Sequence, residues 1–191
     1  EKKINLPLPK RGIKLNSGEV GFYRSAYTAD LLPQISDSIE KRELKQDDRF
    51  GMVRDTVALT GSGEIGINEL FMILEQYRGE TSYNVWVEII SGLVEIDVLL
   101  VDQAVQKQFH QYCLSLLKPI AANVNWLPKK GEANNTTLLR ALIIGSLGRF
   151  GHQTTISKAK ALFKKAADLK AEEHNLSFAS CGGSPMFQIG G

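Results

Sequence analysis

The chain has 191 residues, enough for one sizeable domain, and its composition of 43% hydrophobic and 23% charged residues is typical of a globular protein. Its 23 basic and 21 acidic residues are mixed along the sequence, giving a net charge of +2, which argues against a nucleic-acid-binding protein. The longest apolar runs are far shorter than the roughly 18 residues that a membrane-spanning helix needs, so we expect no membrane span.

The first 24 residues have a strand-like pattern. Ile4, Leu6 and Leu8 alternate with other residues, and two further apolar runs flank a turn at residues 16–18. This pattern predicts a short N-terminal β-hairpin. Two or three strands are unstable alone, so we interpret residues 1–24 as the end of a larger β-domain. Because the chain begins with Glu1 and not with Met, we expect it to be excised from a longer protein.

From Tyr27 to about Lys170 the apolar residues follow a helical period. Asp47 or Asp48 is expected to cap a first helix that ends at the turn 61–63. We expect Asn68 to cap a second helix that ends at Gly79. Ser82 is expected to open a third, with apolar residues at 3–4 spacing: Val85, Trp86, Ile89, Ile90, Leu93 and Val94.

Three more helical segments follow. The first is expected over residues 103–122, kinked or shortened by Pro119, and residues 126–132 form a clear break after it. Residues 138–147 are apolar on nearly all sides, which predicts a buried helix, and residues 152–155 begin another. The sequence thus predicts a mainly α fold, with antiparallel helix pairs stacked as an α-solenoid of the HEAT/armadillo type. Periodicity is lost over residues 171–191, which we interpret as an irregular, flexible tail.

A search for catalytic or metal-binding residues yields no candidates. The histidines His110, His152 and His174 have no His or Cys partner at metal-ligand spacing, and the His-Glu-x-x-His motif of zinc peptidases is absent. We interpret His110 as a partly buried packing residue and His152 as capping or exposed at a helix start. We therefore predict no catalytic, cofactor-binding or metal-binding residue in this chain.

Cysteines and lysines are also interpreted structurally. Cys113 lies in an apolar helical stretch and Cys181 in a glycine-rich tail, so the two do not suggest a disulfide framework. This favours a reducing compartment and hence a cytoplasmic protein. The only basic concentrations are Lys129–Lys130 and the lysines between residues 158 and 170, which we interpret as solvated faces and not as anion sites.

Several motifs resemble those of zinc aminopeptidases of the gluzincin class. Residues 13–24, with their spaced glycines and Phe-Tyr-Arg ending, are similar to the segment that joins the β-sandwich domain of these enzymes to their C-terminal helical domain. Residues 48–55 resemble the Asp-Arg start of an early helix, and residues 83–86 resemble a Tyr-x-x-Trp motif. The most specific similarity, to the puromycin-sensitive type, comes from residues 126–132 with 138–140 and 151–152.

The resemblance implies that residues 1–24 end a β-sandwich domain and that residues 25–170 are the first part of a helical domain. That domain would enclose the active-site chamber and limit the access of peptide substrates. The zinc and the catalytic domain would belong to the parent enzyme, so this chain alone is not expected to cleave peptides. After Asp168 the sequence departs from the family pattern, which indicates a truncated or altered copy. The alternative is a stand-alone helical interaction protein derived from such an enzyme.

Overall fold

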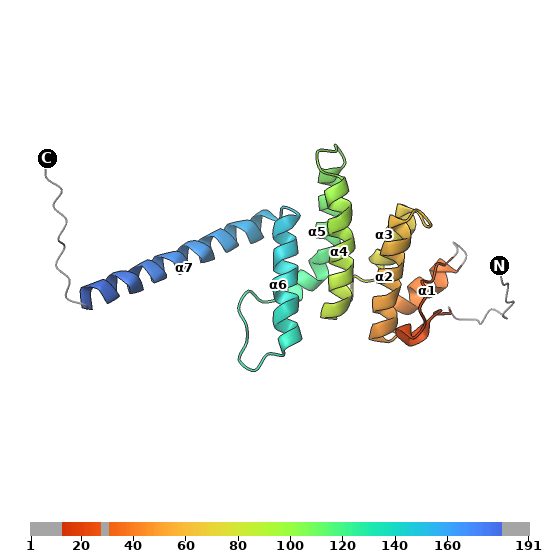
Figure 1. Ribbon diagram of the computed structural model, residues 1–191, viewed down its shortest axis with the longest axis horizontal. Coiled ribbons are helices and arrows are strands. Elements are labelled where there is room, and N and C mark those ends of the chain that lie inside the picture. The colour runs from red at the N-terminus through yellow and green to blue at the C-terminus, as the bar shows by residue number, and fades with distance from the viewer. Residues whose placement is uncertain (1–12, 28–30, 181–191) are drawn as a thin grey trace. The chain divides into compact units, whose positions relative to one another are not determined.

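The computed structural model describes residues 13–27 and 31–180, with side chains described as far as residue 168. Within these ranges the protein is helical and contains no strand, so the predicted mainly α class is confirmed (Figure 1). A single 3-10 turn precedes the α-helices, in the order η1 (Ser17–Glu19), α1 (Leu32–Glu40), α2 (Gln46–Gly61), α3 (Ile67–Glu75), α4 (Tyr83–Leu99), α5 (Gln106–Asn123), α6 (Asn134–Arg149) and α7 (Gln153–Ser180).

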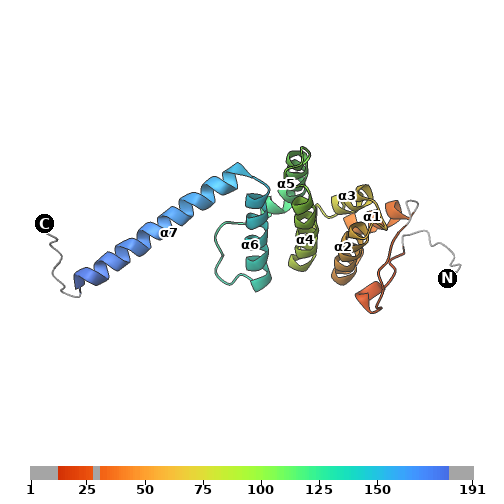
Figure 2. The ribbon, with the colours of Figure 1, turned by 45° about the horizontal axis from the view of Figure 1, so that its top comes forward.

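The chain divides into two units, residues 1–150 and residues 151–191. In the first unit α2, α4 and α6 stand side by side, as Figures 1 and 2 both show, and α2 packs on α4 while α4 packs on α6. A second row is formed by α3, which packs on α2, and α5, which packs on α4 and α6. Aromatic rings join this second row, because Phe71 of α3 lies 4.7 Å from Tyr112 of α5 between ring centroids.

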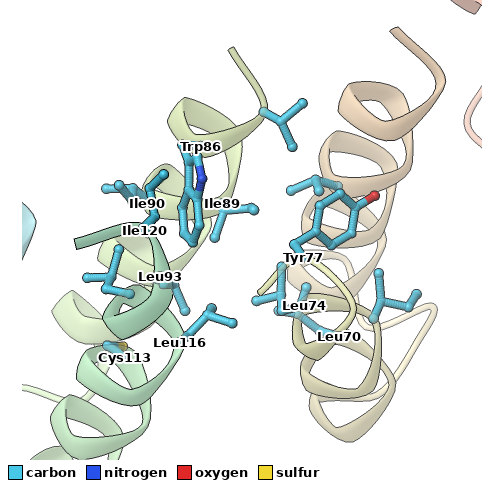
Figure 3. Close-up of a cluster of buried hydrophobic side chains, with 14 of the residues drawn as sticks. Leu70, Leu74, Tyr77, Trp86, Ile89, Ile90, Leu93, Cys113, Leu116 and Ile120 are labelled. Carbon is cyan, nitrogen blue, oxygen red and sulfur yellow. The ribbon is translucent and has the colours of Figure 1, made fainter. Parts of the chain in front are cut away.

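The core of the first unit follows from the helical apolar period. Trp86, Ile89 and Leu93 of α4 are fully buried, as are Cys113 and Leu116 of α5. Figure 3 shows these side chains facing Leu70 and Leu74 of α3 and Tyr77 in the turn after it. Side chains three and four residues apart share one face of a helix, so the spacing in α4 places its apolar residues together on the interior side.

The α2–α4 contact depends on a glycine. A Cβ atom added to Gly92 of α4 would lie 2.6 Å from Cγ2 of Val57 on α2. The absence of a side chain at this position therefore allows the two helices to approach closely.

The predicted N-terminal hairpin is wrong where the structure describes it. Residues 13–24 contain η1 and no strand, while Ile4, Leu6 and Leu8 lie outside the described residues. Asn16 and Gly18 adopt left-handed backbone conformations, with φ of 51° and 73°. These dihedrals turn the chain twice within three residues, so an extended strand cannot form there.

Two predicted helix caps are also wrong. The N-cap of α3 is Gly66, and Asn68 lies inside the helix; the N-cap of α2 is Lys45, which places Asp47 and Asp48 in the first turn. Both acidic residues still suit that turn, where the helix dipole favours negative charge. The predicted N-cap Ser82 of α4 is confirmed, although its side chain makes no capping hydrogen bond.

The ends of the later helices differ from the predicted ones. Pro119 lies inside α5, which continues to Asn123, so the proline does not end the helix. The buried side chain of Ile120 holds this last turn against the core. In the second unit α7 continues to Ser180, so residues 171–180 of the predicted irregular tail are helical, and residues 181–191 lie outside the described part. Over the residues searched, no helix is long and apolar enough to cross a membrane.

Candidate functional site

Residues 13–27, here called the junction segment, bind to α2 through a series of polar contacts. Oδ1 of Asp48 accepts a hydrogen bond from the backbone N–H of Gly18 at 2.7 Å, and Oδ2 accepts a longer one from the hydroxyl of Ser17. Within the segment, the amide side chain of Asn16 accepts from the N–H of Gly21 and donates to the carbonyl of that residue. These bonds satisfy backbone groups that strand pairing would otherwise use.

Glu19 makes the central contact of the junction segment. Its carboxylate bridges two cations, lying 2.9 Å from Nζ of Lys14 and 2.5 Å from a guanidinium nitrogen of Arg54 on α2. The carboxylate also lies against the backbone of α2 at Gly51, where an added Cβ atom would be 1.8 Å from Oε1 of Glu19. An alanine at position 51 would therefore displace the Glu19 carboxylate from this ion-pair arrangement.

Asp55 closes the contact at the other end of the segment. Its Oδ2 accepts a hydrogen bond from the buried N–H of Ser25 at 2.9 Å, and Oδ1 lies 3.7 Å from the guanidinium of Arg24. The hydroxyl of Tyr27 accepts a hydrogen bond from the N–H of Leu15, and burial raises the pKa of Tyr27 to about 12. Asp48, Gly51 and Asp55 lie at intervals of three and four residues, so one face of α2 holds the whole segment.

The outer side of the junction segment is apolar and uncovered. Val20 and Phe22 are 86% and 112% exposed, and Tyr23 is 57% exposed. These residues line an open hollow of about 430 Å³ together with Arg24 and Arg54. Large apolar side chains grouped on a surface are typical of an interaction site, so this face is a candidate for contact with another domain or chain.

A buried ion pair connects α2 with the start of α4. Nε of Arg49 lies 2.6 Å from Oε2 of Glu80, and the other oxygen of Glu80 accepts hydrogen bonds from the N–H groups of Thr81 and Ser82. The indole N–H of Trp86 donates to the carbonyl of Glu80 at 3.0 Å. Burial acts to raise the pKa of Glu80, but the hydrogen bonds from Arg49, Ser82 and Thr81 outweigh it and hold that pKa below its ordinary value.

A second polar cluster lies between α4, α5 and α6. Nε2 of His110 is 2.6 Å from Oδ1 of Asp97, and the guanidinium of Arg149 lies 3.1 Å from Oδ2. Burial acts to raise the pKa of Asp97, while the hydrogen bonds from His110 and Gln106 lower it below its ordinary value. The imidazole of His110 also packs on Phe150, with ring centroids 5.6 Å apart. His110 is therefore a partly buried packing residue, as predicted, but one with a carboxylate partner that the sequence did not indicate.

The other histidine and cysteine residues considered in the sequence analysis lie in surroundings that explain them structurally, where the structure describes them. Nδ1 of His152 lies 2.8 Å from the hydroxyl of Thr155 at the start of α7, in agreement with the predicted capping role. Cys113 is buried, and burial raises the pKa of its thiol to about 12. Cys181 lies outside the described residues, as does the side chain of His174. Among the residues that could be searched, no group of three His, Cys, Asp or Glu side chains is placed to hold a metal ion.

The sequence motifs thus mark residues whose role in the structure is to hold segments together. Asp48, Arg49, Gly51 and Asp55 belong to one motif, and each meets a partner distant in sequence. The motif positions were visible in the sequence, but their partners Gly18, Glu80, Glu19 and Ser25 could not be inferred without the fold. Nothing in the sequence indicated that the acidic residues Glu80 and Asp97 form buried ion pairs.

Comparison with known proteins identifies the family of this chain. A family model described as "ERAP1-like C-terminal domain" matches residues 12–177, which begins at the junction segment and includes nearly all described helices. Aminopeptidase M1-A of Oryza sativa subsp. japonica is 31% identical over 154 residues, covering 79% of this chain and 17% of that protein. The puromycin-sensitive aminopeptidase of Caenorhabditis elegans is 29% identical over 157 residues, covering 81% and 17%.

Aminopeptidase 2 of Candida albicans matches a longer stretch, with 26% identity over 179 residues, 92% of this chain and 19% of that protein. The chain therefore spans less than a fifth of the length of these curated relatives. The family match covers well over half of the chain, and the protein belongs to the ERAP1-like C-terminal domain family.

Proposed function

We propose that this chain is the non-catalytic first part of the helical domain of a zinc aminopeptidase similar to the puromycin-sensitive type. The observation that carries the proposal is the family match over residues 12–177, supported by relatives that are named as aminopeptidases. In the proposal the parent enzyme removes N-terminal amino acids from peptides in the cytoplasm. Zinc and the catalytic residues belong to the parent's catalytic domain, which is the partner of this chain.

The proposed role of the chain is to enclose the active-site chamber and limit the access of peptides. The two packed rows, α2–α4–α6 and α3–α5, support an α-solenoid, which offers an extended wall for such a chamber. Residues 1–24 are proposed to end a β-sandwich domain, and residues 25–170 to begin the helical domain. The exposure of Phe22 supports this division. Its apolar side chain is exposed to solvent in the isolated chain, and the neighbouring domain would cover it.

The first test is an immunoblot of source-cell lysate with an antibody raised against residues 40–165. The proposal expects a single band on the order of 100 kDa, the size of a protein with several domains. A band at the 21.1 kDa of this chain would instead identify a stand-alone product and favour a helical interaction protein.

A second test uses Phe22→Ser. In the isolated chain this substitution should change the free energy of unfolding by less than about 0.5 kcal/mol, because the side chain is fully exposed. In the parent, loss of a buried aromatic anchor at a domain contact should lower the midpoint of thermal inactivation measurably. Lys107→Ala, at an exposed position on α5 away from the segment, serves as the control. An equal effect of Phe22→Ser in both proteins would contradict a domain contact at this residue.

A further inference from the structure

A polar pocket lies where the loop after α5 meets the first turns of α6. It has a volume of about 360 Å³, and its lining includes the side chains of Lys129, Lys130, Thr136 and Arg140. Asn123 and Asn125 also line it. This volume exceeds many times the roughly 30 Å³ that one water molecule occupies in the liquid, so a small ligand fits.

Arg140 is the distinctive residue of this pocket. Its side chain is buried, with the whole residue only 6% exposed, and one guanidinium nitrogen contacts both oxygens of Glu132. Its Nε is buried and has no hydrogen-bond partner in the part of the chain that the structure describes. A buried guanidinium with an unpaired N–H is unfavourable unless another acceptor completes its coordination.

The carboxylate of Glu132 is itself an anion bound in this pocket. Besides Arg140, it accepts hydrogen bonds from the hydroxyl of Thr137 and the backbone N–H of Lys129. The hydrogen bond from Arg140 lowers the pKa of Glu132 to about 2, so the carboxylate is ionised at neutral pH. The groups around Glu132 are therefore arranged to receive negative charge.

The residues that line the pocket still carry a net positive charge. Lys129, Lys130 and Arg140 contribute three cations against the single carboxylate of Glu132. The ammonium group of Lys130 forms no ion pair with any described carboxylate. The first turn of α6 has no acidic residue and its N-cap, Ala133, makes no side-chain capping hydrogen bond, so the positive end of this helix dipole adds to the excess positive charge.

We infer that this pocket binds a small oxyanion, a phosphate or carboxylate group, between Lys129, Lys130 and Arg140. The guanidinium of Arg140 and the two ammonium groups, which line the pocket beside the first turn of α6, donate to the oxyanion. The two lysines, which the sequence alone suggests are merely solvated, thus have a ligand-binding role because the fold places them beside Arg140. The inference concerns this chain alone and does not depend on the proposed parent enzyme.

The test titrates the full chain with inorganic phosphate and, separately, with acetate, at constant ionic strength set by sodium chloride. Binding is followed by the backbone amide resonances of residues 129–137. Saturable shifts confined to the pocket support the site; tighter phosphate binding assigns a phosphoryl group, and tighter acetate binding assigns a carboxylate. Absence of saturable shifts with both anions would overturn the inference.

Two variants sharpen the test. The double substitution Lys129→Gln and Lys130→Gln should weaken binding about tenfold or more, because two charge-assisted donors are lost. Lys107→Gln serves as the control, since Lys107 is an exposed lysine on α5 about 24 Å of helix away from Asn123. Equal affinity in the double variant and the control variant would show that the shifts arise from general screening of charge.

The opposite change should strengthen binding. Glu132→Gln removes the competing carboxylate, so phosphate should bind about threefold to tenfold more tightly, as expected when one like charge is removed near a protein surface. Added phosphate should also raise the melting temperature of Glu132→Gln more than that of the unmodified chain. If Glu132→Gln weakens binding while its fold is retained, the Glu132 carboxylate does not compete with the oxyanion and the inference fails.

Discussion

The junction segment and the α3–α4–α5 core are held in place by opposite kinds of interaction. In residues 13–27 the only buried residues are Asn16 and Ser25, both polar, and the segment depends on Asp48 and Asp55 of α2. In the core, side chains such as Trp86 are fully buried among apolar neighbours. Hydrogen bonds specify direction but contribute modest net energy, whereas apolar burial contributes more energy with little directional preference. The junction segment is therefore accurately placed but locally detachable, while the core must unfold as a whole.

The largest effect is expected in the core. Trp86→Ala should lower the free energy of unfolding by about 3–5 kcal/mol, because it removes a large buried side chain and leaves a cavity. Urea unfolding followed by circular dichroism measures the change. Trp126→Ala is the matched control, since Trp126 is partly exposed in the loop before α6, and it should cost clearly less. Similar losses at both positions would contradict the location of the core.

An intermediate effect is expected for the buried ion pair. Glu80→Gln leaves the guanidinium of Arg49 without a charged partner and should cost about 3 kcal/mol at pH 7. Glu75→Gln, which breaks the exposed pair with Arg78, should cost less than about 1 kcal/mol.

The same pair predicts a pH dependence. Because the pKa of Glu80 is lower in the folded state than its ordinary value of 4.5, Glu80 stabilises the fold above that pH. This contribution should be lost as the pH falls through the lowered pKa. Urea unfolding of the unmodified chain between pH 6 and pH 3 should therefore show a decline that is smaller in Glu80→Gln. An identical decline in the two proteins would show that another group is responsible.

The smallest effect is expected for the junction segment. Asp48→Ala removes the acceptor for the N–H of Gly18 and should cost about 1–2 kcal/mol. The loss should be local, so hydrogen exchange should accelerate at Gly18 and remain unchanged in α4. Asp47→Ala is the control, because the neighbouring Asp47 is exposed. Accelerated exchange in α4 as well would mean that segment and core are one cooperative unit.

The helices could be predicted from the sequence because the 3–4 residue spacing of their apolar side chains repeats over many residues. The apolar spacing in α4 and the break before α6 both appear in the structure near the expected positions. The hairpin prediction was wrong because alternation over a few residues does not reveal the left-handed backbone at Asn16 and Gly18. The oxyanion pocket was hidden for a different reason, since Lys130 and Arg140 lie ten residues apart and meet only through the loop before α6.

The position of Gly51 has a consequence for protein engineering. Replacing a helical glycine with alanine is a common way to stabilise a helix, with a gain of up to about 1 kcal/mol. At Gly51 the added methyl group would occupy the place of the Glu19 carboxylate. Gly145 and Gly148 of α6 have no neighbouring atom within 4 Å of an added Cβ, so alanine fits there. A stabilised version of this domain should therefore accept alanine in α6 and retain glycine at position 51.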